Sequence, residues 1–144
     1  MKKYKYGATT KKSEKPVYKG ITFDSDHEME YYKHLESMVE SGEIINIYRQ
    51  IPYTLIDGFS INGKKRLPAK LILDFEFTLK DGTTIYQDYK GNPTPKAELQ
   101  RKLFESRYQV PLQWISYSKI DGGFIDYDEL KKRRSKRKKE MTKK

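Results

Sequence analysis

The most regular alternation of apolar and polar side chains runs from Ala69 to Leu79. From position 71 to position 79 every odd-numbered side chain is apolar, and the even-numbered side chains are mostly polar. A period of two residues is typical of a β-strand with one face in the core. Asp74 falls on the more polar face, although burying a carboxylate among apolar neighbours costs several kcal/mol unless a partner compensates it.

Around this strand the pattern predicts one domain with alternating helices and strands. A helix begins at Asp24-Ser25, where Ser25 to Glu28 match a capping box, and it ends at Ser41-Gly42. Before the central strand, the pattern predicts a turn or hairpin over 18–23, strands over 43–51 and 53–59 separated by Pro52, and a basic turn over 60–66. After it come a strand including 86–91, a helix over 95–108 with Leu99, Leu103 and Phe104 towards the core, and a strand over 112–116. The chain then forms a loop over 121–123 and a final helix capped by Asp126 or Asp128.

This order favours an α/β (α+β) fold with a mixed sheet flanked by helices. The helix over 95–108 connects two strands. Such a right-handed crossover places the last strand parallel to a neighbour in the sheet.

The turn Lys80-Asp81-Gly82-Thr83 decides which residues face each other across the hairpin. A two-residue Asp-Gly loop would place Asp74 opposite Tyr89, with Asp88 on the other face. A three-residue loop with Gly82 left-handed would place Asp74 opposite Asp88, with Lys90 on the same face. We favour the second register, which also gathers four apolar side chains on the other face: Phe75, Phe77, Ile85 and Tyr89.

Two carboxylates on adjacent strands suit a hard cation with oxygen ligands, Mg²⁺ or Mn²⁺. Such an ion polarises a phosphoryl oxygen and lowers the pKa of a bound water. Lys90 could orient that water or offset charge in the transition state, and Gly91 would let a phosphate backbone approach closely. The alternative is an Asp–Lys pair on the exposed face of a hairpin, because the pattern D-x-K is common.

The charge of the chain is concentrated at its two ends. The 144 residues carry a net charge of +10; residues 131–144 hold ten Lys or Arg and one Glu, and residues 1–19 hold seven Lys and one Glu. Residues 20–130 have the difference, a net charge of −5. An acidic centre between basic ends fits a cation site with a polyanion held around it. A like-charge run is also typical of a solubilising tail.

Composition excludes several classes of protein. There is no cysteine, so disulfides and cysteine-based zinc or iron–sulfur sites are excluded. Hydrophobic residues make up 35% of the chain and aromatic residues 13%, enough for one core. No apolar run approaches the roughly 18 residues of a membrane span, and the N-terminus has no signal-type segment. We therefore expect a soluble cytoplasmic protein with no membrane partner.

Asp74, followed after a hairpin by Asp88-Tyr89-Lys90, resembles the motif of the PD-(D/E)XK nuclease superfamily. The predicted order of helix, three strands, helix and strand is similar to the core of that superfamily. Leu73 stands where the motif has proline, and Asp88 replaces glutamate. A wider pattern over most of residues 4–130 resembles a small family of phage and prophage endonuclease-like proteins: Lys5-Tyr6-Gly7-Ala8, Phe23-Asp24-Ser25 with Glu28, Asp74-Phe75, Asp88-Tyr89-Lys90-Gly91 and Lys102-Leu103-Phe104-Glu105.

The resemblance implies a restriction-endonuclease-like core and a role for each site residue. Asp74 and Asp88 would ligate Mg²⁺ or Mn²⁺, with the backbone carbonyl of Tyr89 as a further ligand. Lys90 would be the catalytic lysine. Glu28, which spacing alone favours as part of a helix cap, would become a carboxylate from the first helix that joins the metal site.

The expected partner is DNA, with a branched or recombination intermediate as the suggested substrate, in a bacterial cell or phage-infected host. The chain divides into a basic arm (1–19), a nuclease domain (20–130) and a basic tail (131–144), and a homodimer would place two sites on two strands. Candidate contacts to nucleic acid are Lys96, Arg101, Lys102, Lys131, Lys132, Arg133 and Arg134. The alternatives are a non-catalytic nucleic-acid-binding protein of the same fold and a protein-binding factor whose acidic centre is incidental.

Overall fold

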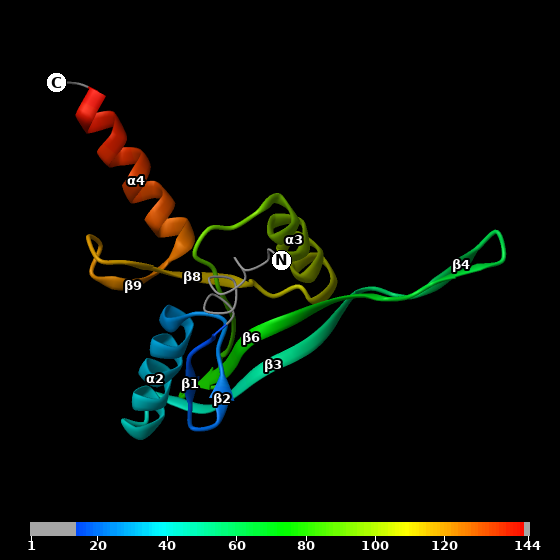
Figure 1. The fold of residues 1–144 in the computed structure, drawn as a ribbon, viewed down its shortest axis with the longest axis horizontal. Helices are drawn as coiled ribbons and strands as arrows, with labels where there is room; N and C mark the ends of the chain where they lie inside the picture. Colours follow the sequence, from blue (N-terminus) through cyan, green and yellow to red (C-terminus); the bar gives the residue numbers. More distant parts are fainter. Residues whose placement is uncertain (1–13, 143–144) are drawn as a thin grey trace, which may run out of the picture.

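A five-stranded mixed sheet forms the centre of the computed structural model, which describes residues 14–142 (Figure 1). The strands lie in the order β3 (Ile44–Ile56), β6 (Ala69–Leu79), β7 (Thr84–Tyr89), β8 (Gln113–Ser118) and β9 (Gly123–Asp126). Three helices are described: α2 (Asp26–Glu40), α3 (Pro95–Tyr108) and α4 (Tyr127–Thr142). The described residues also form two short hairpins: β1 (Val17–Tyr18) with β2 (Ile21–Thr22), and β4 (Phe59–Ile61) with β5 (Lys64–Arg66). The predicted α+β fold with a mixed sheet is confirmed.

The two central helices begin and end close to where the sequence predicts. Ser25 caps α2 because its hydroxyl oxygen accepts the backbone N–H of Glu28 at 3.1 Å. Thr94 caps α3 in the same way through the N–H of Ala97. Residues 1–13 lie outside the described part, so the predicted arm is seen only from residue 14, and the Lys5-Tyr6-Gly7-Ala8 motif is not described. No described helix has the length and apolar character needed to cross a membrane.

The sheet departs from the prediction at three places. Pro52 does not separate two strands; β3 runs through it, because β3 is an edge strand where a missing N–H removes no ladder bond. The segment 60–66 is a β-hairpin rather than a turn alone. Strand β9 was not predicted. The parallel pairing of β7 with β8 confirms the crossover through α3.

The register of the β6–β7 hairpin agrees with the three-residue loop. Phe75 pairs with Gln87 and Phe77 with Ile85, so the same register places Asp74 opposite Asp88. At the turn, the N–H of Gly82 donates to the carbonyl of Leu79 at 2.9 Å, and Gly82 has a φ of 96°. The turn chemistry therefore sets which side chains meet at the far end of the hairpin.

Replacing Gly82 with alanine is expected to destabilise the protein by about 1–2 kcal/mol, because an L-residue is strained at positive φ. No atom lies within 4 Å of the position of the added Cβ, so the loss reports the backbone alone. The measurement is the free energy of unfolding in urea. Gly91→Ala is the matched control: its Cβ would also enter open space, and it has no positive φ, so its stability should hold. Equal losses at both positions would contradict the proposed strain at Gly82.

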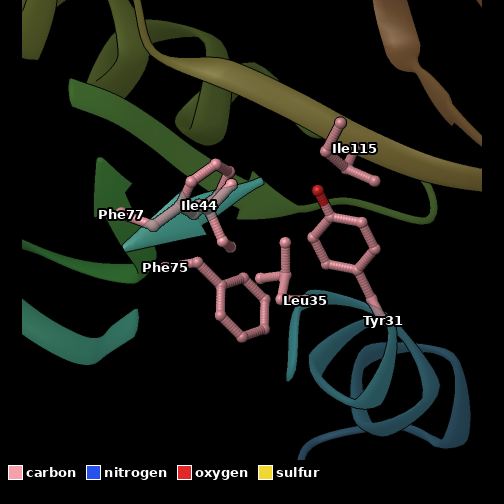
Figure 2. Close-up of a cluster of buried hydrophobic side chains, with 6 residues drawn as sticks. All are labelled: Tyr31, Leu35, Ile44, Phe75, Phe77 and Ile115. Atoms are coloured by element: carbon pink, nitrogen blue, oxygen red, sulfur yellow. The ribbon is translucent and has the colours of Figure 1, made fainter. Parts of the chain in front are cut away.

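The two helices α2 and α3 cover different hydrophobic clusters. Phe75 and Phe77 pack with Tyr31 and Leu35 of α2 (Figure 2), whereas Leu73 packs with Phe104 of α3. Four of the five odd positions predicted to be apolar, from Leu71 to Phe77, are buried, whereas Leu79 is half-buried, and the buried ones do not all face one core. Leu99 was predicted to face the core and is 56% exposed. Because Leu99 is two residues from the buried Ala97, it lies on the opposite side of α3.

The alternation of side chains along β6 breaks at Asp74. Glu76 accepts a hydrogen bond from the hydroxyl of Tyr53, whose ring packs against Phe104 of α3. Glu76 and Leu73 therefore both face α3, which regular alternation forbids for an even and an odd position. Opposite Asp74 on β3, Gln50 adopts a left-handed backbone with φ of 53°. This irregular point in both strands is where the candidate site lies.

Residues 131–142 of the predicted basic tail are part of helix α4. Asp126 accepts the N–H of Glu129 at 3.0 Å, which confirms one of the two predicted caps for α4. Leu130 is buried, and beyond it the side chains of α4 are almost all exposed. In Figure 1 the helix projects away from the sheet. Its basic residues are therefore spaced along an exposed helix that continues to Thr142.

Candidate active site

The carboxylates of Asp74 and Asp88 lie next to each other across the hairpin. The backbone N–H of Asp74 donates to Asp88 Oδ1 at 2.9 Å, and the N–H of Tyr89 donates to Asp74 Oδ2 at 2.9 Å. Asp88 is 2% exposed and Asp74 is half-buried. Gln50 Nε2 approaches the remaining oxygen of Asp74 at 3.3 Å. These contacts hold two carboxylates in one orientation, as the predicted register requires.

Lys90 lies beside this pair. Its Nζ is 3.7 Å from Asp88 Oδ2, and its side chain keeps contact with solvent. The backbone of Lys90 is anchored on β8, because its N–H donates to the carbonyl of Ile115 at 2.8 Å. Anchored on the sheet and free at its tip, Lys90 can reach both the carboxylates and a ligand in front of them.

Glu28 reaches the same region from α2, but it does so with a partner. Its side chain is 4% exposed, and Arg49 Nη2 lies 3.9 Å from Glu28 Oε2. The Arg49 guanidinium lies over the ring of Phe23 at 4.4 Å and near that of Tyr32 at 5.6 Å. Within residues 14–142 its buried Nε has no hydrogen-bond partner. The backbone N–H of Glu28 thus serves the helix cap, while its carboxylate faces the interior.

Burial raises the pKa values of all three acids, and repulsion from a neighbouring carboxylate adds to the rise for Glu28 and Asp74. Burial raises the pKa of Glu28 from 4.5 to about 7, with a further contribution from the charge of Asp74. Burial and the charge of Asp88 raise the pKa of Asp74 from 3.8 to about 6. The pKa of Asp88 is also raised, chiefly by burial, against the opposing effect of Lys90. Buried acids that repel each other are in an environment that a cation would stabilise.

The donor set fits a hard cation. Asp74 Oδ1 and Asp88 Oδ2 are the two oxygens that do not accept backbone N–H groups, and they belong to adjacent carboxylates. Mg²⁺ takes one or two carboxylates and keeps several waters, so a protein site of this size suffices. No group of three or more His, Asp or Glu side chains in residues 14–142 is arranged to hold a metal. Within these residues Glu28 is thus not grouped with Asp74 and Asp88 as a third ligand, although the charge of Asp74 acts on it.

Comparison with known protein families identifies the family of this chain. A model of a protein family of unknown function, DUF1064, matches residues 3–122. The chain belongs to the DUF1064 family. No curated protein matches the chain. Because the family has no assigned function, the resemblance to PD-(D/E)XK nucleases remains a prediction.

The residues predicted to contact nucleic acid in this DUF1064 protein divide into two groups. Lys96, Lys102, Lys131, Lys132 and Arg134 are exposed and available to a ligand. The other two are engaged within the domain. Arg133 contacts Glu129 at 3.3 Å and Asp121 at 3.7 Å.

Arg101 is held at the junction of α3 and α4. It donates to both carboxylate oxygens of Asp128 at 3.2 and 2.8 Å and to the carbonyl of Leu112 at 2.8 Å. Its guanidinium also lies 4.4 Å from the centre of the Trp114 ring. These contacts join α4 to the body of the protein, so Arg101 stabilises the junction.

Two residues at the site were missed from the sequence. Arg49 and Gln50 lie in the middle of an edge strand, and no motif or spacing marks them. Gln50 could have been suspected only if the break in β6 at Asp74 had been foreseen. The sequence marks Arg49 even less clearly, because it is a single basic residue within a largely apolar strand.

Proposed function

We propose that this DUF1064 protein is a metal-dependent DNA endonuclease of the PD-(D/E)XK type. The observation that supports this most strongly is the hairpin register, which brings Asp74 against Asp88 with Lys90 Nζ 3.7 Å from Asp88. The order α2, β3, β6, β7, α3, β8 supports a restriction-endonuclease-like core. The break in β6 at Asp74 supports a functional role as well, because irregular backbone concentrates at active sites.

Asp74, Asp88 and the backbone carbonyl of Tyr89 would hold Mg²⁺ or Mn²⁺. When bound, the ion would polarise a phosphoryl oxygen and lower the pKa of a bound water. Lys90 Nζ donates to the attacking water or to a phosphate oxygen, and its charge offsets the negative charge that develops there. Gln50 orients Asp74 through its hydrogen bond to Oδ1.

Glu28 and Arg49 would act on this site from the α2 side. Arg49 offsets part of the charge of Glu28, and Glu28 adds negative charge near Asp74. Because its carboxylate is paired with Arg49, Glu28 would take part by positioning solvent rather than as a direct ligand. Arg49 keeps Glu28 in place through its ion pair and its contacts with two aromatic rings.

Basic residues on α3 and α4 support DNA as the substrate. Lys96 and Lys102 are exposed on α3, and α4 presents a row of lysines on one side: Lys131, Lys132, Lys136 and Lys139. Contacts of such residues with phosphates supply sequence-independent affinity. A branched or recombination intermediate of a phage remains the proposed natural substrate.

The test is cleavage of three labelled substrates: a supercoiled plasmid, single-stranded DNA and a four-way junction. With MgCl₂ we expect cleavage of at least one substrate, and with EDTA we expect none. Cleavage in EDTA would contradict a role for the metal. Salt-sensitive binding without cleavage of any substrate would instead favour a non-catalytic nucleic-acid-binding protein.

A further inference from the structure

An extended hairpin projects from the sheet between β3 and β6. It comprises residues 56–70, called here the hairpin arm, and contains β4 and β5 (Figure 1). All fifteen of its residues are exposed. An isolated two-stranded hairpin is at best marginally stable in water. An arm that neither joins a core nor covers one therefore points to an external partner.

One face of the arm combines apolar and basic side chains. Phe59 pairs with Arg66 and Ile61 with Lys64, so these four side chains share a face. Phe59 and Ile61 are each 52% exposed. Ser60 and Lys65 pair on the opposite face. The ribbon thus offers both charge and apolar contact to one ligand.

The charge of the arm is almost entirely positive. Lys64, Lys65, Arg66 and Lys70 lie within it, and its only acid is Asp57 at the base. Asp57 is paired with Arg107 of α3 at 2.8 Å. The free charges of the arm therefore attract a polyanion.

The shape of the arm is set by its own backbone. Asn62 and Gly63 at the tip have φ of 51° and 73°, the conformation that a tight two-residue hairpin turn needs. At the base, a Cβ on Gly58 would lie 3.0 Å from the carbonyl oxygen of Arg66, so the two strands cross closely there. A ribbon already ordered in this way loses little conformational entropy on binding.

We infer that the hairpin arm lies in a groove of duplex DNA, about one helical turn from the Asp74–Asp88 site. A two-stranded ribbon fits the major groove, which is about 12 Å wide. Ten residues of chain separate Lys64 in β5 from Asp74 in β6, with Leu67 and Pro68 outside either strand, which gives a span of at most about 33 Å at the usual strand rise. One turn of B-DNA is about 34 Å. Lys64 and Arg66 contact phosphates, and Phe59 and Ile61 contact the edges of bases.

The arm is less suited to a second copy of the chain. A symmetric contact through the same face would bring Lys64 and Arg66 close to the same positive charges of the second copy, and neighbouring like charges are destabilising. Strands β4 and β5 have three residues each, which gives little length for edge pairing. Duplex DNA matches the charge, the width and the reach of the arm together.

The test is DNA binding by the full chain carrying Lys64→Gln and Arg66→Gln. The matched control carries Lys80→Gln and Lys119→Gln, which remove the same charge at exposed positions outside the arm. Fluorescence anisotropy of a labelled 30-bp duplex is measured from 50 to 200 mM KCl in EDTA, so that metal-dependent cleavage does not interfere. The slope of log K against log [KCl] should fall in magnitude by about 2 for the arm variant, at about 0.9 for each lost phosphate contact. The control should keep the slope of the unaltered protein.

Equal slopes for the two variants would overturn the inference. So would a change in oligomeric state on analytical ultracentrifugation without a change in slope, which would make the arm a self-association element. The arm lies outside both hydrophobic clusters, so the thermal midpoint of each variant should equal that of the unaltered protein.

The inference takes duplex DNA from the proposed function but concerns binding alone. Binding that depends on the arm, without cleavage in Mg²⁺, would contradict the proposed function but not the role of the arm in binding. Cleavage with an unchanged slope would remove only the role of the arm.

Discussion

Replacing Asp74 with asparagine is expected to reduce Mg²⁺-dependent DNA cleavage by about a thousand-fold or more. Metal coordination supplies several kcal/mol of transition-state stabilisation, and each 1.36 kcal/mol corresponds to a factor of about ten in rate. Asparagine keeps the size of the side chain and an oxygen that can accept the N–H of Tyr89, so the hairpin register should remain. The measurement is the initial rate of plasmid cleavage at saturating Mg²⁺.

Glu40→Gln is the matched control for that substitution. It also removes one carboxylate charge, at an exposed position at the end of α2, and should leave the rate unchanged.

Lys90→Met should reduce the cleavage rate about as much as Asp74→Asn does. It should not weaken the stabilisation of the protein by Mn²⁺, because Lys90 is not a ligand. If Asp74→Asn cleaved as fast as the unaltered protein, Asp74 would have no part in catalysis.

In the absence of divalent cations, the protein is expected to lose stability as the pH rises from about 4.5 through 7. The folded-state pKa of Glu28 is raised from 4.5 to about 7, so its contribution to stability is fully present below 4.5 and is lost as the pH rises through 7. A rise of this size corresponds to about 3 kcal/mol. Asp74, raised from 3.8 to about 6, adds to the loss in the same direction. The measurement is urea denaturation in EDTA at pH 5 and pH 8.

Glu28→Gln should remove most of this pH dependence, because glutamine stays neutral across the range. At pH 8, Mn²⁺ should raise the thermal midpoint of the unaltered protein, since a ligand that binds only the folded state stabilises it. Asp74→Asn should abolish that rise. A stability that increased with pH in EDTA would contradict the account of the buried acids.

Turn chemistry made the candidate site predictable. An Asp-Gly pair allows few hairpin geometries, and only the three-residue loop gathers both aspartates and Lys90 on one side of the hairpin. The structure has that loop, with Gly82 left-handed. The capped helices α2 and α3 were predictable for the same reason, because Ser25 and Thr94 bond locally to nearby N–H groups.

Features set by tertiary contacts were not predictable. The break in alternation at Asp74 lies opposite the left-handed Gln50 of another strand, a contact that a period of two along β6 does not reveal. Leu99 was assigned to the core because it is apolar, yet the buried face of α3 is set by Ala97 and Phe104. Arg49 meets Glu28 only because β3 passes under α2.

The metal site itself can be tested with a crystal structure in Mn²⁺, examined by anomalous scattering. We expect an anomalous peak between the carboxylates of Asp74 and Asp88, with Lys90 Nζ beside it and Glu28 outside direct contact. The peak should vanish in Asp74→Asn crystals grown and soaked in the same way. A structure with Mn²⁺ bound elsewhere and no peak between Asp74 and Asp88 would contradict the claim that they form a metal site.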